Sequence, residues 1–118
     1  MFLQLSHTRL NVFQSSKQLA LECYRITRVF PNEEKFSMVQ QIRRAALSVH
    51  LNITEGCSRK SNSERKRYFE IARGSVIEID SAIDIALELT YVTMAQLEKL
   101  GLNIVNTFKL LSGLITHN

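Results

Sequence analysis

The chain is 118 residues long and carries 15 Lys and Arg residues against 11 Asp and Glu, a formal net charge of +4. Hydrophobic residues make up 45% of it, with one proline, four glycines, two cysteines and no tryptophan. This length predicts one domain over residues 1–118, with enough apolar material for a core that needs no disulfide. Intrinsic disorder and a disulfide-dependent miniprotein are therefore excluded, and the net charge alone does not indicate a nucleic-acid-binding protein.

The first seven residues have neither the charged start nor the apolar run of a signal peptide. No later segment approaches the roughly 18 uninterrupted apolar residues of a membrane span. We therefore expect a cytoplasmic protein that does not enter a membrane. Cys23 and Cys57 lack metal-ligand spacing and are expected to be free thiols.

Apolar residues recur every three or four positions, which predicts an all-α protein. A first helix is expected over residues 8–30, because Pro31 cannot donate the helical hydrogen bond. A second helix is expected over residues 37–55. Ser37 is its candidate N-cap, and Gly56 is expected to end it.

A polar basic loop over residues 56–62 leads into a long third helix, which is expected to extend to about Tyr91. Ser61 and Glu64 match a capping box at its start, and Thr93 and Gln96 match another before a fourth helix. Four amphipathic helices with short connections predict an antiparallel up-down-up-down four-helix bundle. The fourth helix is expected to turn these residues inward: Leu97, Leu100, Ile104, Phe108, Leu111 and Ile115.

The sequence does not indicate catalysis or metal binding. His7 and His117 lie near the termini, and His50 has no nucleophile at a spacing that the sequence establishes. The acidic residues of the third helix lack the paired Glu-x-x-His motifs of di-iron bundles. We therefore expect a protein that is not an enzyme, with no catalytic residue, no metal site and no cofactor.

Basic residues are concentrated in the middle of the chain. Eleven of the 15 Lys and Arg residues lie between Arg25 and Arg73, together with only five of the 11 acidic residues. Such a concentration attracts phosphate groups, although a short basic cluster is also common as solvated surface. The candidate nucleic-acid-binding residues are Arg43, Arg59, Lys60, Arg65, Lys66, Arg67 and Arg73.

Polar residues at helical spacing form a ridge beside the apolar face of the second helix. We interpret this ridge as half of a buried polar network that fixes the register of the second and third helices. In the alternative interpretation, Arg43, Arg44 and Asn52 belong to a ligand or nucleic-acid surface. The expected network comprises Gln41, Arg44, Ser48, Asn52 and Glu55 on the second helix, with Gly74, Ser75 and Glu78 on the third, where Gly74 and Ser75 permit close helix approach.

Some apolar residues lie away from the inward stripes of their helices. Contiguous apolar surface is usually covered in a soluble protein, so these positions favour a homo-oligomer. The candidate interface residues are Leu47, Leu51, Ile77, Leu102 and Val105.

The stretch from Gln41 to Gly56 reads Q-x-R-R-A-x-x-S-x-x-x-N-I-x-E-G. This pattern resembles that of the four-helix bundle proteins encoded in 23S ribosomal RNA intervening sequences. The resemblance extends to Phe30-Pro31 before the motif and to the run from Phe69 to Ser75 after it. It implies a bundle that assembles into a ring, a pentamer, similar to the accessory proteins of diversity-generating retroelements, which bind nucleic acid and a reverse transcriptase.

Two hypotheses for function follow. The first is a non-enzymatic oligomer that binds nucleic acid, structured RNA above all, through phosphate contacts. Its phenylalanines fall on core stripes and Tyr68 is the one aromatic beside the basic cluster, so charge and shape are expected to outweigh base stacking. The second is a scaffold that binds a protein partner, with an incidental basic patch.

Overall fold

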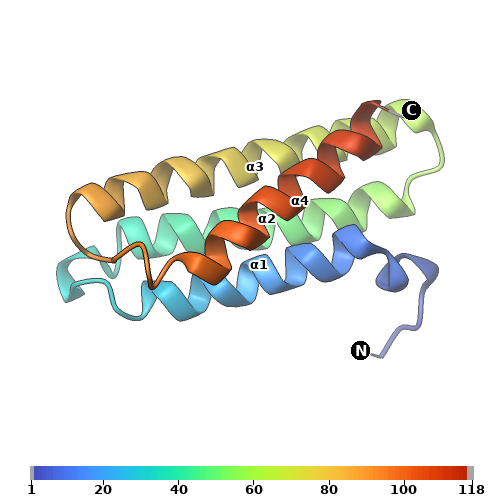
Figure 1. The fold of residues 1–118 in the computed structure, drawn as a ribbon. Helices are drawn as coiled ribbons and strands as arrows, with labels where there is room; N and C mark the ends of the chain where they lie inside the picture. The colour runs from blue at the N-terminus through green and yellow to red at the C-terminus, as the bar shows by residue number, and fades with distance from the viewer. Residues whose placement is uncertain (1, 117–118) are drawn as a thin grey trace.

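The computed structural model describes residues 2–116, and these residues form four α-helices and no strand. The helices are α1 (Asn11–Thr27), α2 (Met38–Ser58), α3 (Asn62–Glu88) and α4 (Glu98–Thr116), with 3-10 helices at Ser6–Arg9 and Asn32–Glu34. Figure 1 shows the chain reversing direction at each of three connections, so that the helices form an elongated bundle measuring 43 × 31 × 24 Å. The predicted all-α four-helix bundle is confirmed. None of the helices in the described part of the chain is long and apolar enough to cross a membrane.

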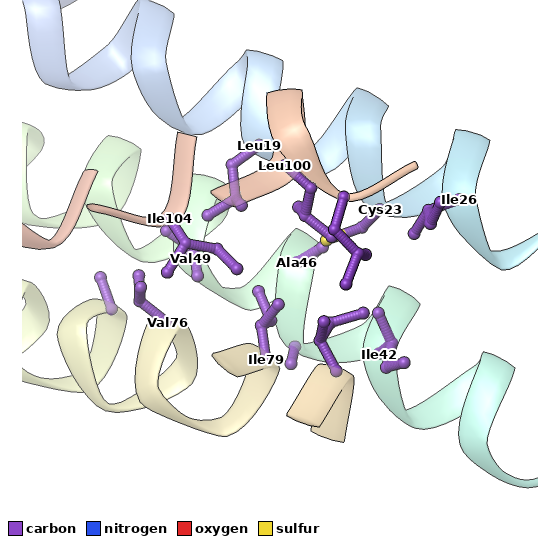
Figure 2. Packing of buried hydrophobic residues seen from close by; sticks show 14 of the residues in the cluster. Leu19, Cys23, Ile26, Ile42, Ala46, Val49, Val76, Ile79, Leu100 and Ile104 are labelled. Carbon is purple, nitrogen blue, oxygen red and sulfur yellow. The ribbon is translucent and has the colours of Figure 1, made fainter. Parts of the chain in front are cut away.

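One hydrophobic core runs along the bundle and takes residues from all four helices. Leu19 of α1, Val49 of α2, Ile79 of α3 and Leu100 of α4 lie close together in it (Figure 2), and all four are fully buried. Burying a side chain of this size stabilises the fold by about 1.5–3 kcal/mol. These stripes fix the rotation of each helix and therefore which residues face outward.

Helix α1 is shorter at both ends than the predicted span of residues 8–30. Leu10 adopts an extended conformation between the first 3-10 helix and α1. At the other end, the amides of residues 28–30 bond to carbonyls three residues back, so the chain tightens into 3-10 geometry before Pro31.

Ser37 precedes α2, as predicted, but its side chain makes no capping hydrogen bond. The carboxylate of Glu34 accepts from the Met38 amide instead, at 3.4 Å. The same carboxylate accepts from the hydroxyl of Tyr91, at 2.8 Å, and this bond raises the pKa of Tyr91. Glu34 thus joins the α1–α2 connection to the α3–α4 connection.

The prediction that Gly56 ends the second helix is wrong. Helix α2 continues through Gly56 to Ser58, and no described glycine has a positive φ. A Cβ atom at Gly56 would lie 2.8 Å from Cε1 of Phe69 and 3.2 Å from Cβ of Tyr68. Gly56 therefore permits α3 to approach α2 closely. The connection between the two helices has three residues, fewer than the loop predicted over residues 56–62.

Helix α3 begins at its predicted cap, where the Ser61 hydroxyl accepts from the Glu64 amide at 3.2 Å. It ends at Glu88 and not at Tyr91. Thr90 adopts a left-handed conformation with φ of 62°, and the Tyr91 amide bonds to the carbonyl of Ala86. This is a Schellman motif, which satisfies the last carbonyls of a helix and reverses the chain.

The predicted capping box before α4 is confirmed, because the Thr93 and Gln96 side chains each accept from the other's backbone amide, at 3.2 and 2.9 Å. The expectation that Phe108 points inward is wrong. Thr107 is fully buried in its place and bonds to the Ser15 hydroxyl of α1 at 2.7 Å. Helix α4 is therefore rotated toward α1, which leaves Phe108 at the surface.

We expect Gly56→Ala to lower the free energy of unfolding by about 1–2 kcal/mol. The methyl group gains helix propensity, about 1 kcal/mol, but it overpacks against the buried ring of Phe69 at a larger cost. Gly74→Ala is the matched control, because a Cβ there meets no atom within 4 Å. In urea unfolding, Gly74→Ala should raise the free energy of unfolding by up to about 1 kcal/mol. A Gly56→Ala variant that is also stabilised would contradict the close approach of α3 to α2 at Gly56.

Candidate nucleic-acid interface

The α2–α3 connection carries the densest group of basic residues, and the fold uses two of them. Arg65 donates to the carbonyls of Cys57 and Arg59, at 3.0 and 3.3 Å. Carbonyls at the end of a helix lack intrahelical partners, so a cation there satisfies them and complements the helix dipole. Arg65 is therefore a cap for α2, which leaves less of its charge for a phosphate.

Arg59 is held in a similar way. It forms an ion pair with Glu55 at 3.0 Å and donates to the hydroxyl of Tyr68 at 3.2 Å, with its guanidinium carbon 5.1 Å from the Tyr68 ring centre. Its Nε atom is buried without a hydrogen-bond partner among the described residues. Glu55, which was predicted to belong to the polar network between the second and third helices, forms this ion pair with Arg59 instead.

Three cations of the α2–α3 connection and the first turns of α3 are exposed: Lys60, Lys66 and Arg67. We call these three residues the basic end. Lys60 lies in the connection itself, and the other two lie on the first turns of α3. Their side chains are available to a ligand, and their neighbours Arg59 and Arg65 add positive charge behind them.

The remaining two predicted nucleic-acid-binding residues do not belong to the basic end. Arg73, on α3, donates to the hydroxyl of Ser112 on α4 at 3.2 Å. Arg43, on α2, donates to the hydroxyl of Thr27 and packs on the ring of Tyr24, both on α1. The fold thus divides the seven predicted residues among three separate helix pairs.

The polar network between α2 and α3 is smaller than predicted. Ser75 donates to the Ser48 hydroxyl at 3.0 Å, and the amide of Asn52 donates to the Ser48 hydroxyl and carbonyl, at 3.1 and 2.8 Å. Gly74 faces outward and does not serve a close helix approach. The other predicted members, Gln41, Arg44 and Glu78, are exposed.

A Ser–His pair was not foreseen from the sequence, because its members are 34 residues apart. Ser16 of α1 and Nδ1 of His50 of α2 lie 2.7 Å apart. The Ser16 hydroxyl also lies within hydrogen-bond distance of the Phe13 carbonyl, at 3.0 Å, and the donor of the Ser16–His50 bond depends on the tautomer of His50. Ser16 is fully buried, so the pair joins two helices and does not present its hydroxyl at the surface.

Burial also affects the two thiols. Cys23 and Cys57 are free cysteines, as predicted. Burial raises the pKa of the Cys23 thiol to about 12 and raises the pKa of Cys57 as well. Since the thiolate is the nucleophilic form, both groups are poor nucleophiles near neutral pH. Among the described residues, which exclude His117, no group of three or more His, Cys, Asp or Glu side chains could hold a metal.

All five predicted interface residues are exposed: Leu47, Leu51, Ile77, Leu102 and Val105. The last three border a groove between α3 and α4, which comprises adjoining hollows of about 500 and 350 Å³. Its lining is mainly apolar, and its charged residues in the described part of the chain are mostly acidic: Asp80, Asp84 and Glu98, against one cation, Lys109. Leu47 and Leu51 lie on α2, away from that groove.

The geometry defines the class of protein as a four-helix bundle with a basic end. The chain belongs to the 23S rRNA-intervening sequence protein family, whose model matches residues 8–113. It is similar to a crystal structure of a protein of unknown function from the S23 ribosomal protein family of Bacteroides thetaiotaomicron, at 25% identity and a TM-score of 0.81, over 89% of this chain and 95% of that one. No curated protein sequence matches the chain significantly.

The surroundings of His50 predict a pH-dependent stability. Partial burial, with Lys17 and His7 nearby, lowers the pKa of His50 below its ordinary value near 6.5. The unfolded chain then binds this proton more readily than the folded protein does. Stability is therefore complete above about pH 6.5 and falls as the pH drops below it.

Urea unfolding at pH 7.5, 6.5 and 5.5 measures this dependence. We expect the free energy of unfolding to fall between pH 6.5 and 5.5 in the native protein and to fall less in His50→Gln. The two proteins are compared by the change in the free energy of unfolding with pH, and not by its value at one pH, because the substitution also alters the contact with Ser16. Equal slopes would show that His50 does not contribute.

Proposed function

We propose that this protein is a non-enzymatic oligomer that binds nucleic acid, with structured RNA as its ligand, in the cytoplasm. Phosphate groups are bound through Lys60, Lys66 and Arg67. The observation that carries the proposal is that these three cations are exposed, while the flanking Arg59 and Arg65 are half-buried and hydrogen-bonded to other groups of the protein.

The arrangement favours contacts with phosphate over contacts with base edges. Long flexible lysines act as point charges, which bind phosphate without reading sequence. The ring of Tyr68, the aromatic at the basic end, is already covered by Arg59. RNA is favoured over DNA because the family to which the chain belongs is described by an intervening sequence of 23S rRNA.

Charge reversal of Lys60, Lys66 and Arg67 to Glu tests this proposal. Each phosphate contact adds about 0.7–0.9 to the slope of log affinity against log salt concentration, so the slope should shrink by about 2–3 and affinity for structured RNA should fall. Arg65 is left intact, because its reversal would remove the cap of α2.

The control reverses three exposed cations elsewhere, Arg28, Lys99 and Lys109, and so changes the net charge equally. RNA affinity is measured by titration at low and near-physiological salt, with circular dichroism to check folding. If the control loses as much affinity as the test variant, binding follows total charge and not the basic end.

Oligomer formation is the second part of the proposal, and a pentamer is the state that the family resemblance suggests. The exposed apolar side chains of Ile77, Leu102 and Val105 form one candidate face, and Leu47 and Leu51 form another. Two different faces on one chain permit head-to-tail contacts, which close into rings.

Leu102→Asp with Val105→Asp should reduce the assembly to single chains, because the new carboxylates would be buried without partners. Light scattering coupled to size exclusion measures the mass. Leu21→Asp on α1 is the control, since Leu21 is equally exposed but lies outside both faces. A native protein that is already a single chain would remove the oligomer from the proposal.

A protein-interaction scaffold is the second candidate function. It is favoured by the acidic groove between α3 and α4, where Asp80, Asp84 and Glu98 surround apolar side chains. A basic amphipathic segment of another protein has the complementary chemistry. This function becomes primary if the native protein binds no nucleic acid.

A further inference from the structure

A second basic surface lies at the opposite end of the bundle from the basic end. Figure 1 shows the α1–α2 connection and the α2–α3 connection at opposite ends. A groove of about 370 Å³ lies between the end of α1 and the start of α2, within the range of about 300–1,000 Å³ that small-ligand pockets occupy. We call it the Phe36 groove. Tyr24, Lys35, Phe36, Arg43 and Arg44 line it, and so does Leu47, which is also a candidate interface residue.

Phe36 is the unexpected member of this groove. Its side chain is 80% exposed, against the prediction that the phenylalanines fall on core stripes. The ring precedes α2, and the ammonium of Lys35 lies 5.4 Å from the ring centre. Exposing a ring of this size costs hydrophobic free energy, and an aromatic ring beside a cation is a common platform for stacking nucleobases.

Arg43 adds a second flat surface to the Phe36 groove. Its guanidinium carbon lies 4.7 Å from the centre of the Tyr24 ring. Two hydrogen bonds hold it there, from Nε to the Thr27 hydroxyl at 2.9 Å and from Nη2 to the Tyr24 carbonyl at 3.3 Å. A planar cation held in this way is preorganised to stack on a base without further loss of side-chain freedom.

The charge of the groove selects the kind of occupant. Lys35, Arg43 and Arg44 are cationic, and none of the described residues that line the groove carries a carboxylate. Flat aromatic surfaces together with positive charge match a nucleotide, which combines a planar base with a phosphate. The groove between α3 and α4 has the opposite character, because its described lining has three carboxylates, Asp80, Asp84 and Glu98, which outnumber its one cation, Lys109.

We propose that the Phe36 groove binds an unpaired nucleotide of single-stranded RNA, with the base stacked on Phe36 and its phosphates near Lys35 and Arg44. This inference rests on the proposed nucleic-acid binding and adds to it a site for bases. Paired regions of a structured RNA would contact the basic end, while an unpaired loop would reach the Phe36 groove. Stacking is tolerant of sequence, so the site takes any base.

The test compares a single-stranded RNA decamer with an abasic decamer that has the same phosphates. The native protein should bind the decamer more tightly than the abasic strand. Phe36→Leu should weaken binding of the decamer about tenfold, because base–aromatic stacking contributes about 1–3 kcal/mol per base, and should leave binding of the abasic strand unchanged. Phe36→Tyr keeps an aromatic ring and should retain the affinity.

We expect Phe36→Leu to fold like the native protein, because Phe36 is exposed. Phe2→Leu is the control, since it removes another exposed ring. Unchanged decamer affinity in Phe36→Leu would overturn the proposal, as would an equal loss with both strands. A change in assembly mass in Phe36→Leu would also overturn it, because the groove would then be an interface between copies. A mononucleotide that binds as tightly as the decamer would reassign the site to a free nucleotide.

These results separate the two proposals. If charge reversal at the basic end weakens binding of structured RNA while Phe36→Leu changes nothing, only the Phe36 groove fails. If the native protein binds neither structured RNA nor the decamer, the proposed function fails with it.

Discussion

The contact between Gly56 and Phe69 is the constraint on which the arrangement of the basic end depends. The missing side chain of Gly56 allows the buried ring of Phe69 to lie against the backbone of α2. This close approach brings the last turn of α2 against the first turns of α3. Arg59 can then reach Tyr68, and Arg65 can reach the final carbonyls of α2. A side chain at position 56 would separate these partners.

Four arginines of this molecule are held by hydrogen bonds and aromatic rings, unlike the cations of the basic end. Arg43, Arg59, Arg65 and Arg73 each donate hydrogen bonds to groups of the protein and lie over an aromatic ring. The guanidinium is suited to this because it is planar, is weakly hydrated and has five donors in a fixed geometry. The exposed cations of the basic end include two lysines, whose compact charges stay in water. A count of positive charges therefore overstates the charge that a ligand can contact.

The charges of the bundle are separated by position along and around it. The basic end and the Phe36 groove lie at opposite ends, and the acidic groove lies between α3 and α4. An extended RNA could contact both basic surfaces of one bundle, which is 43 Å in its longest dimension. The acidic groove would repel phosphate, so it remains available to a basic protein surface or to another copy of the chain.

Local signals in the sequence were sufficient for the existence of the four helices and for the caps before α3 and α4, but not for most helix ends. Apolar spacing identified four helices, and the caps at Ser61 and Thr93 formed as predicted, because these features depend on residues three or four positions apart. The motif from Gln41 to Gly56 identified the family. What the sequence left open was how each helix rotates and which residues meet across the bundle.

Only the tertiary structure decided those points. The exposure of Phe36, the inward turn of Thr107 in place of Phe108, and the pairing of Ser16 with His50 depend on contacts between distant segments. The same holds for the seven predicted nucleic-acid-binding residues, which share a charge but separate among three helix pairs. Sequence spacing reports neighbours along one helix, whereas packing of four helices determines which charged side chains are bound by the protein and which remain exposed.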